Sequence, residues 1–152
     1  MARFRYRMQS ILDIKMKLET QAKQEFAAAK AVLDMENEKL LALKARKSGY
    51  EEKAKALLKG TLKLQEIADN KEAILKMDEY ISAQLLQIKL AEKKLETARN
   101  RLKEVMQDRK MHEKLKEHAF EEFLAEEKKQ EGKEVDELTS YTYGQRIELK
   151  GR

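Results

Sequence analysis

Apolar residues recur at alternating steps of three and four along most of the chain. The heptad pattern is unbroken from residue 74 to 105, and a second stripe of the same spacing runs from residue 26 to 57. This spacing places the apolar side chains on one face of a helix, where they form the seam of a coiled coil. The pattern predicts an all-α fold with two long helices, over about residues 3–58 and 71–131.

A short segment separates the two stripes. Residues 59–70 contain Gly60, which is typical of a helix end, and the pair Asp69 and Asn70, which is typical of a helix start. A short connection between two long helices favours an antiparallel arrangement. The sequence therefore predicts an antiparallel coiled-coil hairpin over residues 1–131, with its connection at residues 59–70.

The stripes also predict a register for this hairpin. In an antiparallel pair the numbers of facing residues have a constant sum, and a sum of 131 brings every stripe residue opposite another. Leu40 then faces Ala91, and Lys47 faces Gln84. After the hairpin the periodicity is weak, so we expect a short helix and a flexible tail over residues 132–152.

Charged residues interrupt the seam near the end that holds both termini. Arg109, His112 and Lys116 stand at seam positions, whereas the next predicted pair, Ile11 and Phe120, is apolar again. This interruption predicts that the seam rotates, so that the basic side chains face outward or line a widened gap. A solvated stretch of helix with extended lysines is the alternative. The rotated seam would use a second local stripe of Ile14, Leu18, Met111 and Leu115.

Composition narrows the class of protein. Of the 152 residues 40% are charged, none is Pro, Cys or Trp, and the formal net charge is +5. Such a chain suits long solvated helices rather than a thick globular core. The lack of cysteine suits a cytosolic protein, and we find neither a membrane-spanning apolar run nor a signal peptide.

No motif for catalysis or cofactor binding is present. The chain has no P-loop and no dinucleotide fingerprint, and its five glycines are isolated. His112 and His118 are six residues apart, so they point in different directions on a helix and do not form a metal pair. Two thin helices also offer no cleft in which a carboxylate could be desolvated. We therefore expect no enzymatic activity, no cofactor and no metal site.

Several large apolar residues lie off the seam near the connection. Leu86 and Leu90 fall on the outer face of the second helix. Tyr80 flanks the seam, and Tyr50, on the stripe of the first helix, lies almost opposite it. A group of this kind favours a contact surface for a partner, with burial along the flank of the seam as the alternative.

The chain also resembles a known family. Its start, "FRYRMQSILDIKMKLETQAKQEF", is similar to the opening of the FliJ family, the small proteins of the bacterial flagellar export apparatus. A later segment, "DRKMHEKLKEHAFEEF", resembles a basic segment of the same family, although Asp108 and His112 depart from the usual Glu and Leu. The resemblance spans about residues 3–139. The matching residues are Phe4, Tyr6, Gln9, Ile11, Leu12, Lys15, Glu19 and Ala22, then Tyr80, Leu85 and Ile88, and finally Arg109, Lys110, Glu113, Lys114, Leu115, Lys116 and Glu117.

The resemblance implies a non-enzymatic coiled coil, similar to the central stalk of rotary ATPases. It implies three kinds of partner: the hexameric flagellar export ATPase FliI, the export gate protein FlhA, and export chaperones that the protein helps to cycle. It further implies a cytoplasmic protein, peripheral at the cytoplasmic face of the inner membrane, which reaches the membrane only through the export apparatus. Neither a cofactor nor nucleic acid is implied.

The resemblance and the charge pattern together give two sets of expected contact residues. For the export gate we expect Tyr50, Tyr80, Leu86 and Leu90. The family inserts the end that holds both termini into the ATPase ring, so the ring contacts are expected there. These residues are Arg3, Arg5, Arg7, Gln9, Ile11, Leu12, Arg109, Lys110, Lys114 and Lys116.

Two other functions stay open at the level of sequence. A stalk protein of a virulence-type secretion system would obey the same physics, and only the FliJ-like motifs favour the flagellar system. A basic coiled coil that binds nucleic acid would use Arg3, Arg5 and Arg7, and its affinity would fall steeply with salt. Acidic residues are interspersed along the chain, and no continuous basic stripe forms.

Overall fold

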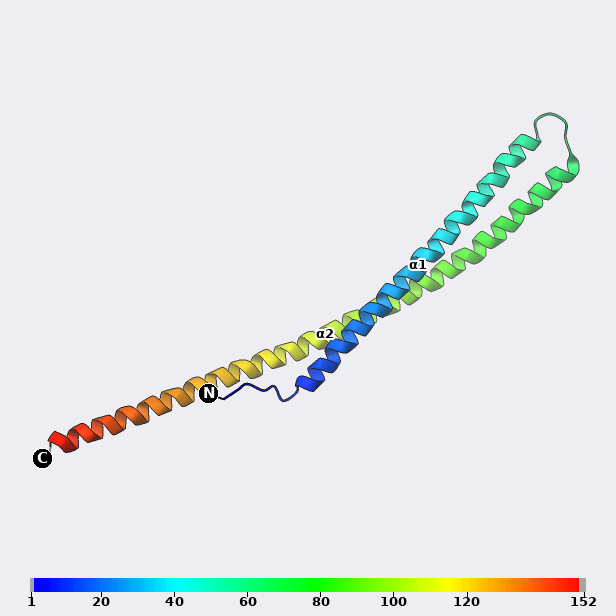
Figure 1. Ribbon diagram of the computed structural model, residues 1–152. Coiled ribbons are helices and arrows are strands. Elements are labelled where there is room, and N and C mark those ends of the chain that lie inside the picture. Colours follow the sequence, from blue (N-terminus) through cyan, green and yellow to red (C-terminus); the bar gives the residue numbers. More distant parts are fainter. Residues whose placement is uncertain (1, 151–152) are drawn as a thin grey trace. The chain divides into compact units, whose positions relative to one another are not determined.

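Two long helices make up the protein. The computed structural model describes residues 2–150, in which α1 (Gln9–Leu57) and α2 (Leu64–Lys150) pack against each other as an antiparallel hairpin (Figure 1). The described residues contain no β-strand. The predicted fold class, an all-α coiled-coil hairpin, is therefore confirmed.

The chain divides into two compact units. Unit 1 comprises residues 1–19 and 105–152, of which 2–19 and 105–150 are described, and unit 2 comprises residues 20–104. Each unit contains a segment of both helices. The two units are described separately below.

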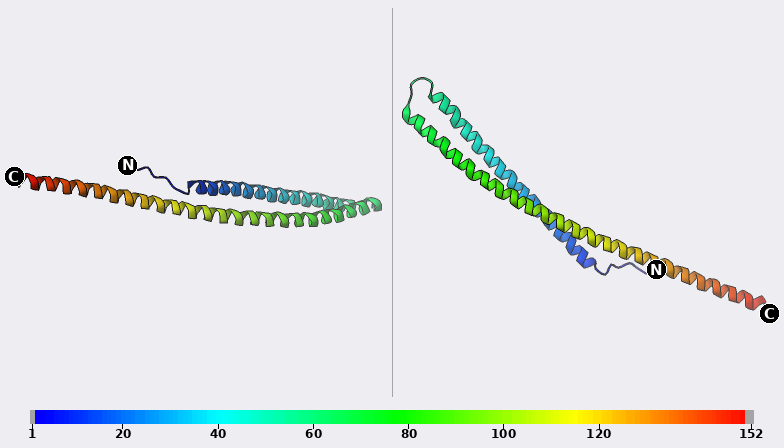
Figure 2. Two further views of the ribbon diagram at one scale, coloured as in Figure 1. Left: turned by 90° about the horizontal axis from the view of Figure 1, so that it is seen from below. Right: turned by 180° about the vertical axis from the view of Figure 1, so that it is seen from behind.

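In unit 2 the helices lie side by side along the predicted seam (Figure 2). Ala22, Met77, Ile88 and Ala91 are buried. In α1 every position of the stripe from residue 26 to 57 is half-buried, and every position between them is exposed. The face that the heptad pattern assigned to the seam is therefore the face that packs.

The register of unit 2 differs from the predicted one. Gln84 Nε2 donates to the backbone carbonyl of Glu36 at 2.8 Å, and Lys47 Nζ lies 2.6 Å from a carboxylate oxygen of Asp78. The residue numbers of these pairs sum to 120 and 125, about one heptad below the predicted 131. The predicted pairing of Lys47 with Gln84 is therefore wrong.

The connection explains this shift. α2 begins at Leu64, and its first helical bond joins the amide of Ile67 to the carbonyl of Lys63 at 3.1 Å. The connection is thus residues 58–63 rather than 59–70, because the expected cap at residues 69 and 70 lies inside α2. A reversal that occurs earlier in the chain lowers the sum of facing residue numbers. Gly60 supplies the positive φ of 79° that this reversal uses.

A buried amide holds this register in place. Asn70 is only 5% exposed, and its Nδ2 donates to the backbone carbonyl of Tyr50 at 2.9 Å. A polar residue buried in a coiled-coil seam fixes register, because a slip separates its donor from the acceptor. Asn70, like Gln84, therefore favours the observed register over the predicted one.

Glycine substitutions in unit 2 are expected to change stability in opposite directions. Gly60→Ala should destabilise the protein by about 1–2 kcal/mol, because a side chain at positive φ is strained. Gly49→Ala should stabilise it by roughly 0.5–1 kcal/mol, because Gly49 lies inside α1 and an added methyl group meets nothing within 4 Å. Thermal melting of the two variants measures both effects, and a Gly60→Ala variant as stable as Gly49→Ala would contradict the strained turn.

Unit 1 departs from the prediction at both of its chain ends. Residues 2–8 are not helical, and α1 begins at Gln9, whose amide donates to the Tyr6 carbonyl at 3.2 Å. α2 continues through Gly132 to Lys150, where a short helix and a flexible tail were predicted. No proline interrupts this stretch, and α2 continues through it although the side chains of residues 132–148 are exposed. Residues 151–152 of the predicted tail lie outside the described part.

Within residues 2–150, neither helix includes a stretch that is both long and apolar enough to cross a membrane.

Candidate functional site

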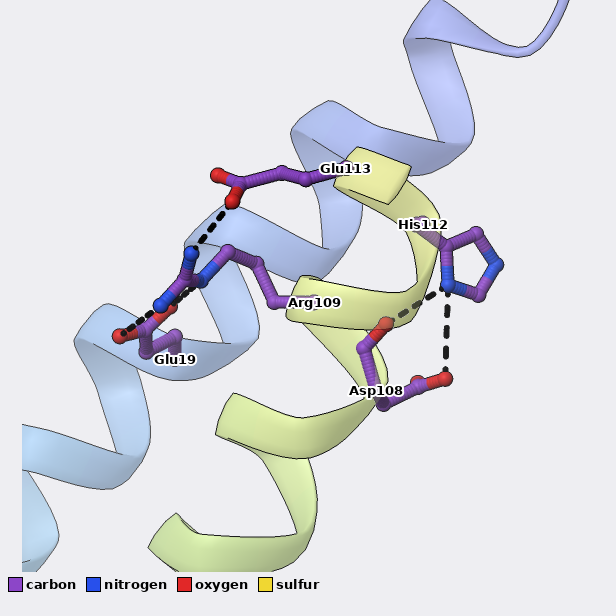
Figure 3. A network of polar contacts seen from close by, with 5 residues as sticks. All are labelled: Glu19, Asp108, Arg109, His112 and Glu113. Atoms are coloured by element: carbon purple, nitrogen blue, oxygen red, sulfur yellow. Dashed lines mark hydrogen bonds and ion pairs between the residues drawn. The ribbon is translucent and has the colours of Figure 1, made fainter. Parts of the chain in front are cut away.

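A layer of charged residues fills the seam of unit 1. Arg109 on α2 forms an ion pair through Nε with the Glu19 carboxylate on α1, and its Nη1 donates to Glu113 at 2.7 Å (Figure 3). The side chains of Arg109 and Glu19 are only 18% and 9% exposed. Arg109 donates a hydrogen bond to the Glu19 carboxylate, and this bond raises the pKa of Arg109. The guanidinium therefore stays charged. We call the whole group the polar layer; its members are Lys15, Glu19, Asp108, Arg109, His112 and Glu113.

A second ion pair joins the helices in the same layer. Lys15 Nζ lies 2.7 Å from Asp108 Oδ2. The Nδ1 atom of His112 lies 2.8 Å from the Asp108 backbone carbonyl and 3.4 Å from Asp108 Oδ1 (Figure 3). The hydrogen bond from Lys15 lowers the pKa of the Asp108 carboxyl, and burial opposes this only in part. Asp108 therefore carries its charge at neutral pH and neutralises Lys15 across the seam.

The predicted rotation of the seam is wrong. Of the four residues that would form the rotated seam, Ile14, Met111 and Leu115 are 55%, 54% and 47% exposed, and only Leu18 is half-buried. The basic residue Arg109 instead keeps its place in the original seam and does not face outward. The physical reason is charge pairing: because Glu19 and Asp108 neutralise the basic residues, the helices can pack along one continuous face.

The polar layer of unit 1 lies beside an aromatic cluster. Phe4, from the non-helical start of the chain, packs against Phe120 at 5.1 Å and Phe123 at 5.4 Å between ring centroids. The sequence had paired Phe120 with Ile11, and that pairing is not observed: Phe120 packs against Phe4 instead, and Ile11 is exposed. A hollow beside the cluster is lined by Phe4, Leu12, Met16, Glu113, Lys116, Glu117 and Phe120.

The structure separates the expected ATPase contacts into exposed and enclosed residues. Leu12 is 1% exposed and Arg109 belongs to the polar layer, so both pack in unit 1; their contact with the ATPase stays a prediction. Gln9 is half-buried and donates to Asp13 at 2.8 Å, and Lys116 is half-buried in the hollow. The exposed members are Arg3, Arg5, Arg7, Ile11, Lys110 and Lys114.

The expected gate contacts lie in unit 2. Tyr80, Leu86 and Leu90 are 51%, 62% and 53% exposed, so the alternative of burial on the flank of the seam is wrong for them. Leu86 and Leu90 line one shallow hollow on α2. Tyr50 is half-buried at the seam, where its backbone carbonyl is occupied by Asn70. An exposed leucine pair with Tyr80 nearby remains available for a partner.

Sequence reasoning missed the role of Glu19. The predicted register pairs this residue with His112, and the observed ion pair joins it to Arg109. Opposite charges at seam positions of both helices were the available signal, but the predicted register hid it. Among the described residues, no group of three or more His, Cys, Asp and Glu side chains is arranged to hold a metal ion.

The ion pair of Lys15 with Asp108 should make stability depend on pH in acid. The folded pKa of Asp108 lies below its ordinary value of 3.8. Its contribution to stability is therefore present above that value and is lost as pH falls through the lower, folded pKa. Asp108→Asn should reduce the drop in melting temperature between about pH 5 and about pH 2. Asp34→Asn, at an exposed position of α1, is the control; an equal reduction in both variants would contradict the prediction.

Comparisons with known proteins give the family. A solved structure of a protein described as a YscO homologue, from Chlamydia trachomatis, has a TM-score of 0.74 and 21% sequence identity, and the match covers 96% of this chain and 99% of that chain. At this identity the likeness shows the fold alone. A search of curated proteins found no match. The family model described as "Flagellar FliJ protein" matches residues 4–148. The match covers nearly the whole two-helix hairpin, and this protein therefore belongs to the flagellar FliJ protein family.

Proposed function

We propose that this protein is a stalk-like component of the flagellar protein export apparatus. In this role it binds the hexameric export ATPase FliI through unit 1 and the export gate protein FlhA through unit 2, and it takes part in cycling export chaperones. It acts in the cytoplasm, at the cytoplasmic face of the inner membrane, and without catalytic activity of its own. The family match over residues 4–148 carries this proposal.

The exposed cations of unit 1 are the proposed contacts with the ATPase ring. Lys110 and Lys114 are exposed and one helical turn apart on α2, so they present two charges on the same face. Arg3, Arg5 and Arg7 add three exposed guanidinium groups from the non-helical start. Guanidinium and ammonium groups at a protein interface select carboxylate partners and speed association. We therefore expect carboxylates on the ring surface that meets unit 1.

The outer face of α2 in unit 2 is the proposed gate contact. Leu86 and Leu90 are exposed, one turn apart, and line the same hollow. An exposed pair of leucines contributes little to the stability of the hairpin, whereas its burial by a partner contributes about 25 cal/mol per Å² of apolar surface. Tyr80 lies on the same helix, and tyrosine is enriched at interfaces.

Reciprocal variants test both contacts in one experiment. Lys110→Glu with Lys114→Glu should lower stimulation of the export ATPase about tenfold, because each reversed charge now repels the ring carboxylates. Leu86→Ala with Leu90→Ala should instead weaken capture of the export gate protein about tenfold, because a central apolar contact is lost. Melting temperatures should stay within a few degrees, since all four positions are exposed.

Each double variant is the control for the other. The lysine variant should keep gate binding, and the leucine variant should keep ATPase stimulation. If the lysine variant stimulates the ATPase as well as the unmodified chain does, the proposed ring contact is wrong. If the leucine variant loses both activities, the leucines hold the fold and are not a gate contact.

A stalk protein of a virulence-type secretion system is the second candidate. The likeness in fold to the YscO homologue from Chlamydia trachomatis favours it. The family match favours the flagellar system. Pull-down of the full chain against the flagellar ATPase and against a virulence-type ATPase separates the two candidates, because only the cognate ring should retain it.

A further inference from the structure

The stretch around the connection has an unusual composition. Residues 53–65 hold four lysines and four leucines and no Asp or Glu, and they form the longest acid-free run of the chain. Residues 39–50 also hold four basic residues and no Asp or Glu, but they lie within α1, where Leu40, Leu43 and Lys47 are half-buried in the seam. We call residues 53–65 the tip. The tip therefore combines a local charge of +4 with leucines, and its reversal at Gly60 makes it the protruding end of the hairpin in unit 2 (Figure 1).

Three of the tip leucines point into solvent. Leu58, Leu62 and Leu64 are 66%, 56% and 78% exposed, whereas Leu57 is half-buried in the seam. Below Leu58 the apolar surface continues into a hollow lined mainly by Ala54, Leu57, Ile67 and Ile74. Because these three leucines are exposed, they contribute little to the packing of α1 against α2. Such a surface fits an apolar partner.

The lysines of the tip lie around these leucines. Lys59 and Lys63 stand within the connection itself, on either side of Gly60 and Leu62. Lys63 reaches Glu66 at 3.9 Å, and Lys55 reaches Glu52 at 3.4 Å. Both ion pairs are exposed to solvent, so each contributes little to stability, and each lysine can pair with another anion instead.

We propose that the tip binds directly to the surface of an anionic lipid bilayer. Leu58, Leu62 and Leu64 enter the boundary between headgroups and acyl chains, while Lys59 and Lys63 extend to the anionic headgroups. Apolar insertion together with basic residues is the combination by which peripheral proteins bind such membranes reversibly. This contact goes beyond the proposed function, in which the membrane is reached only through other proteins of the apparatus.

The size and shape of the tip favour a bilayer over a protein partner. A stable protein interface takes about 800 Å² from each side, and the exposed leucines of the tip lie within residues 58–64 alone, at the end of the hairpin. A fluid bilayer adapts to so small a surface, and its anionic headgroups complement a segment that has no acidic residue. The observations therefore favour a lipid surface.

Vesicle flotation of the full chain tests the proposal. The unmodified protein should float with vesicles of equimolar phosphatidylcholine and phosphatidylglycerol, and not with phosphatidylcholine alone. Leu62→Ser with Leu64→Ser should lower the bound fraction about tenfold, because two inserted side chains are lost. Lys59→Gln with Lys63→Gln should lower it at least as much.

Matched controls separate the tip from other surfaces. Leu41→Ser with Leu124→Ser removes two exposed leucines outside the tip and should leave flotation unchanged. Arg3→Gln, Arg5→Gln and Arg7→Gln remove the three basic residues of the non-helical start and should also leave flotation unchanged. Loss of flotation in either control, or full flotation of both tip variants, would overturn the proposal.

A fluorescent reporter measures insertion itself. The chain contains no tryptophan, so Leu62→Trp places a single indole in the tip. Its emission should shift to the blue with the anionic vesicles, whereas that of Leu41→Trp should not. Absence of binding to both kinds of vesicle would overturn the proposal and would assign the tip leucines to a protein partner. Because no ATPase or gate protein is present, this result is independent of the proposed export function.

Discussion

A chain with cysteines at positions 33 and 91 is expected to close an intramolecular disulfide, and a chain with cysteines at 40 and 91 is not. Inter-helix contacts in unit 2 join residues whose numbers sum to between 120 and 126, as in Glu36 with Gln84 and Glu25 with Arg101. Leu33 and Ala91, whose sum is 124, fit this register, and both lie on the seam.

The alternative pair is too far apart to react. In the observed register, position 40 lies seven residues further along α1 than position 33 does. At ~1.5 Å per residue, this adds about 10 Å along the helix axis. A disulfide needs Cα atoms within about 7 Å. Oxidation at low protein concentration, followed by non-reducing electrophoresis, should show a fast monomer band for Leu33→Cys/Ala91→Cys only.

Each double-cysteine variant controls for the reactivity of the other, since both share the cysteine at position 91. Efficient closure of Leu40→Cys/Ala91→Cys would restore the register predicted from the heptads alone. Disulfide-linked dimers in both variants, without a fast monomer band in either, would contradict the hairpin itself.

Breaking the ion pair in the polar layer is expected to destabilise unit 1 more than any surface change. Arg109→Leu removes the guanidinium that neutralises Glu19, a residue that is only 7% exposed. The charge of Glu19 then stays in a dehydrated seam, and the melting temperature should fall by roughly 5–10 °C. The heptad pattern alone would predict a higher melting temperature for Arg109→Leu, because leucine continues the apolar stripe.

The double variant isolates the cause. Glu19→Leu with Arg109→Leu removes both charges, so it should melt at or above the temperature of the unmodified protein. Lys110→Leu makes the same change at the neighbouring exposed position and should shift melting by no more than a few degrees. If Arg109→Leu alone melts as high as the double variant does, the ion pair does not hold the layer.

Burial of charge in this layer has a consequence for function. Arg109 was expected to face the ATPase ring, and its guanidinium is instead occupied by Glu19 and Glu113. Variants of Arg109 therefore report on the stability of unit 1, whereas Lys110 and Lys114 report on the proposed ring contact. Tests of ATPase stimulation should use the exposed pair, because loss of activity in an Arg109 variant would mix both effects.

The sequence by itself determined which faces pack. Alternating steps of three and four leave one arrangement in which apolar side chains escape water, so the stripe from residue 26 to 57 is half-buried as predicted. The same local pattern, free of proline and rich in helix formers, determined that the fold is all-α. The exposed pair of Leu86 and Leu90 also followed from the heptad, because outer positions are fixed once the seam is known.

Only the tertiary structure decided the register. A heptad repeat matches itself after a shift of seven residues, so apolar residues meet apolar residues in both registers and the pattern cannot choose between them. The choice came from the place where the chain reverses, at residues 58–63, and from buried polar atoms such as Asn70 Nδ2 that find partners in one register alone.

The polar layer and the aromatic cluster were decided in the same way. Arg109 in a seam looked like an interruption, because its partner Glu19 lies 90 residues away in sequence and is found only when the register is known. Phe4 reaches Phe120 from a non-helical segment, to which helical periodicity does not apply. Local periodicity thus determines which residues face the seam. Long-range pairing of charges and aromatic rings determines which residue of the other segment each of them contacts.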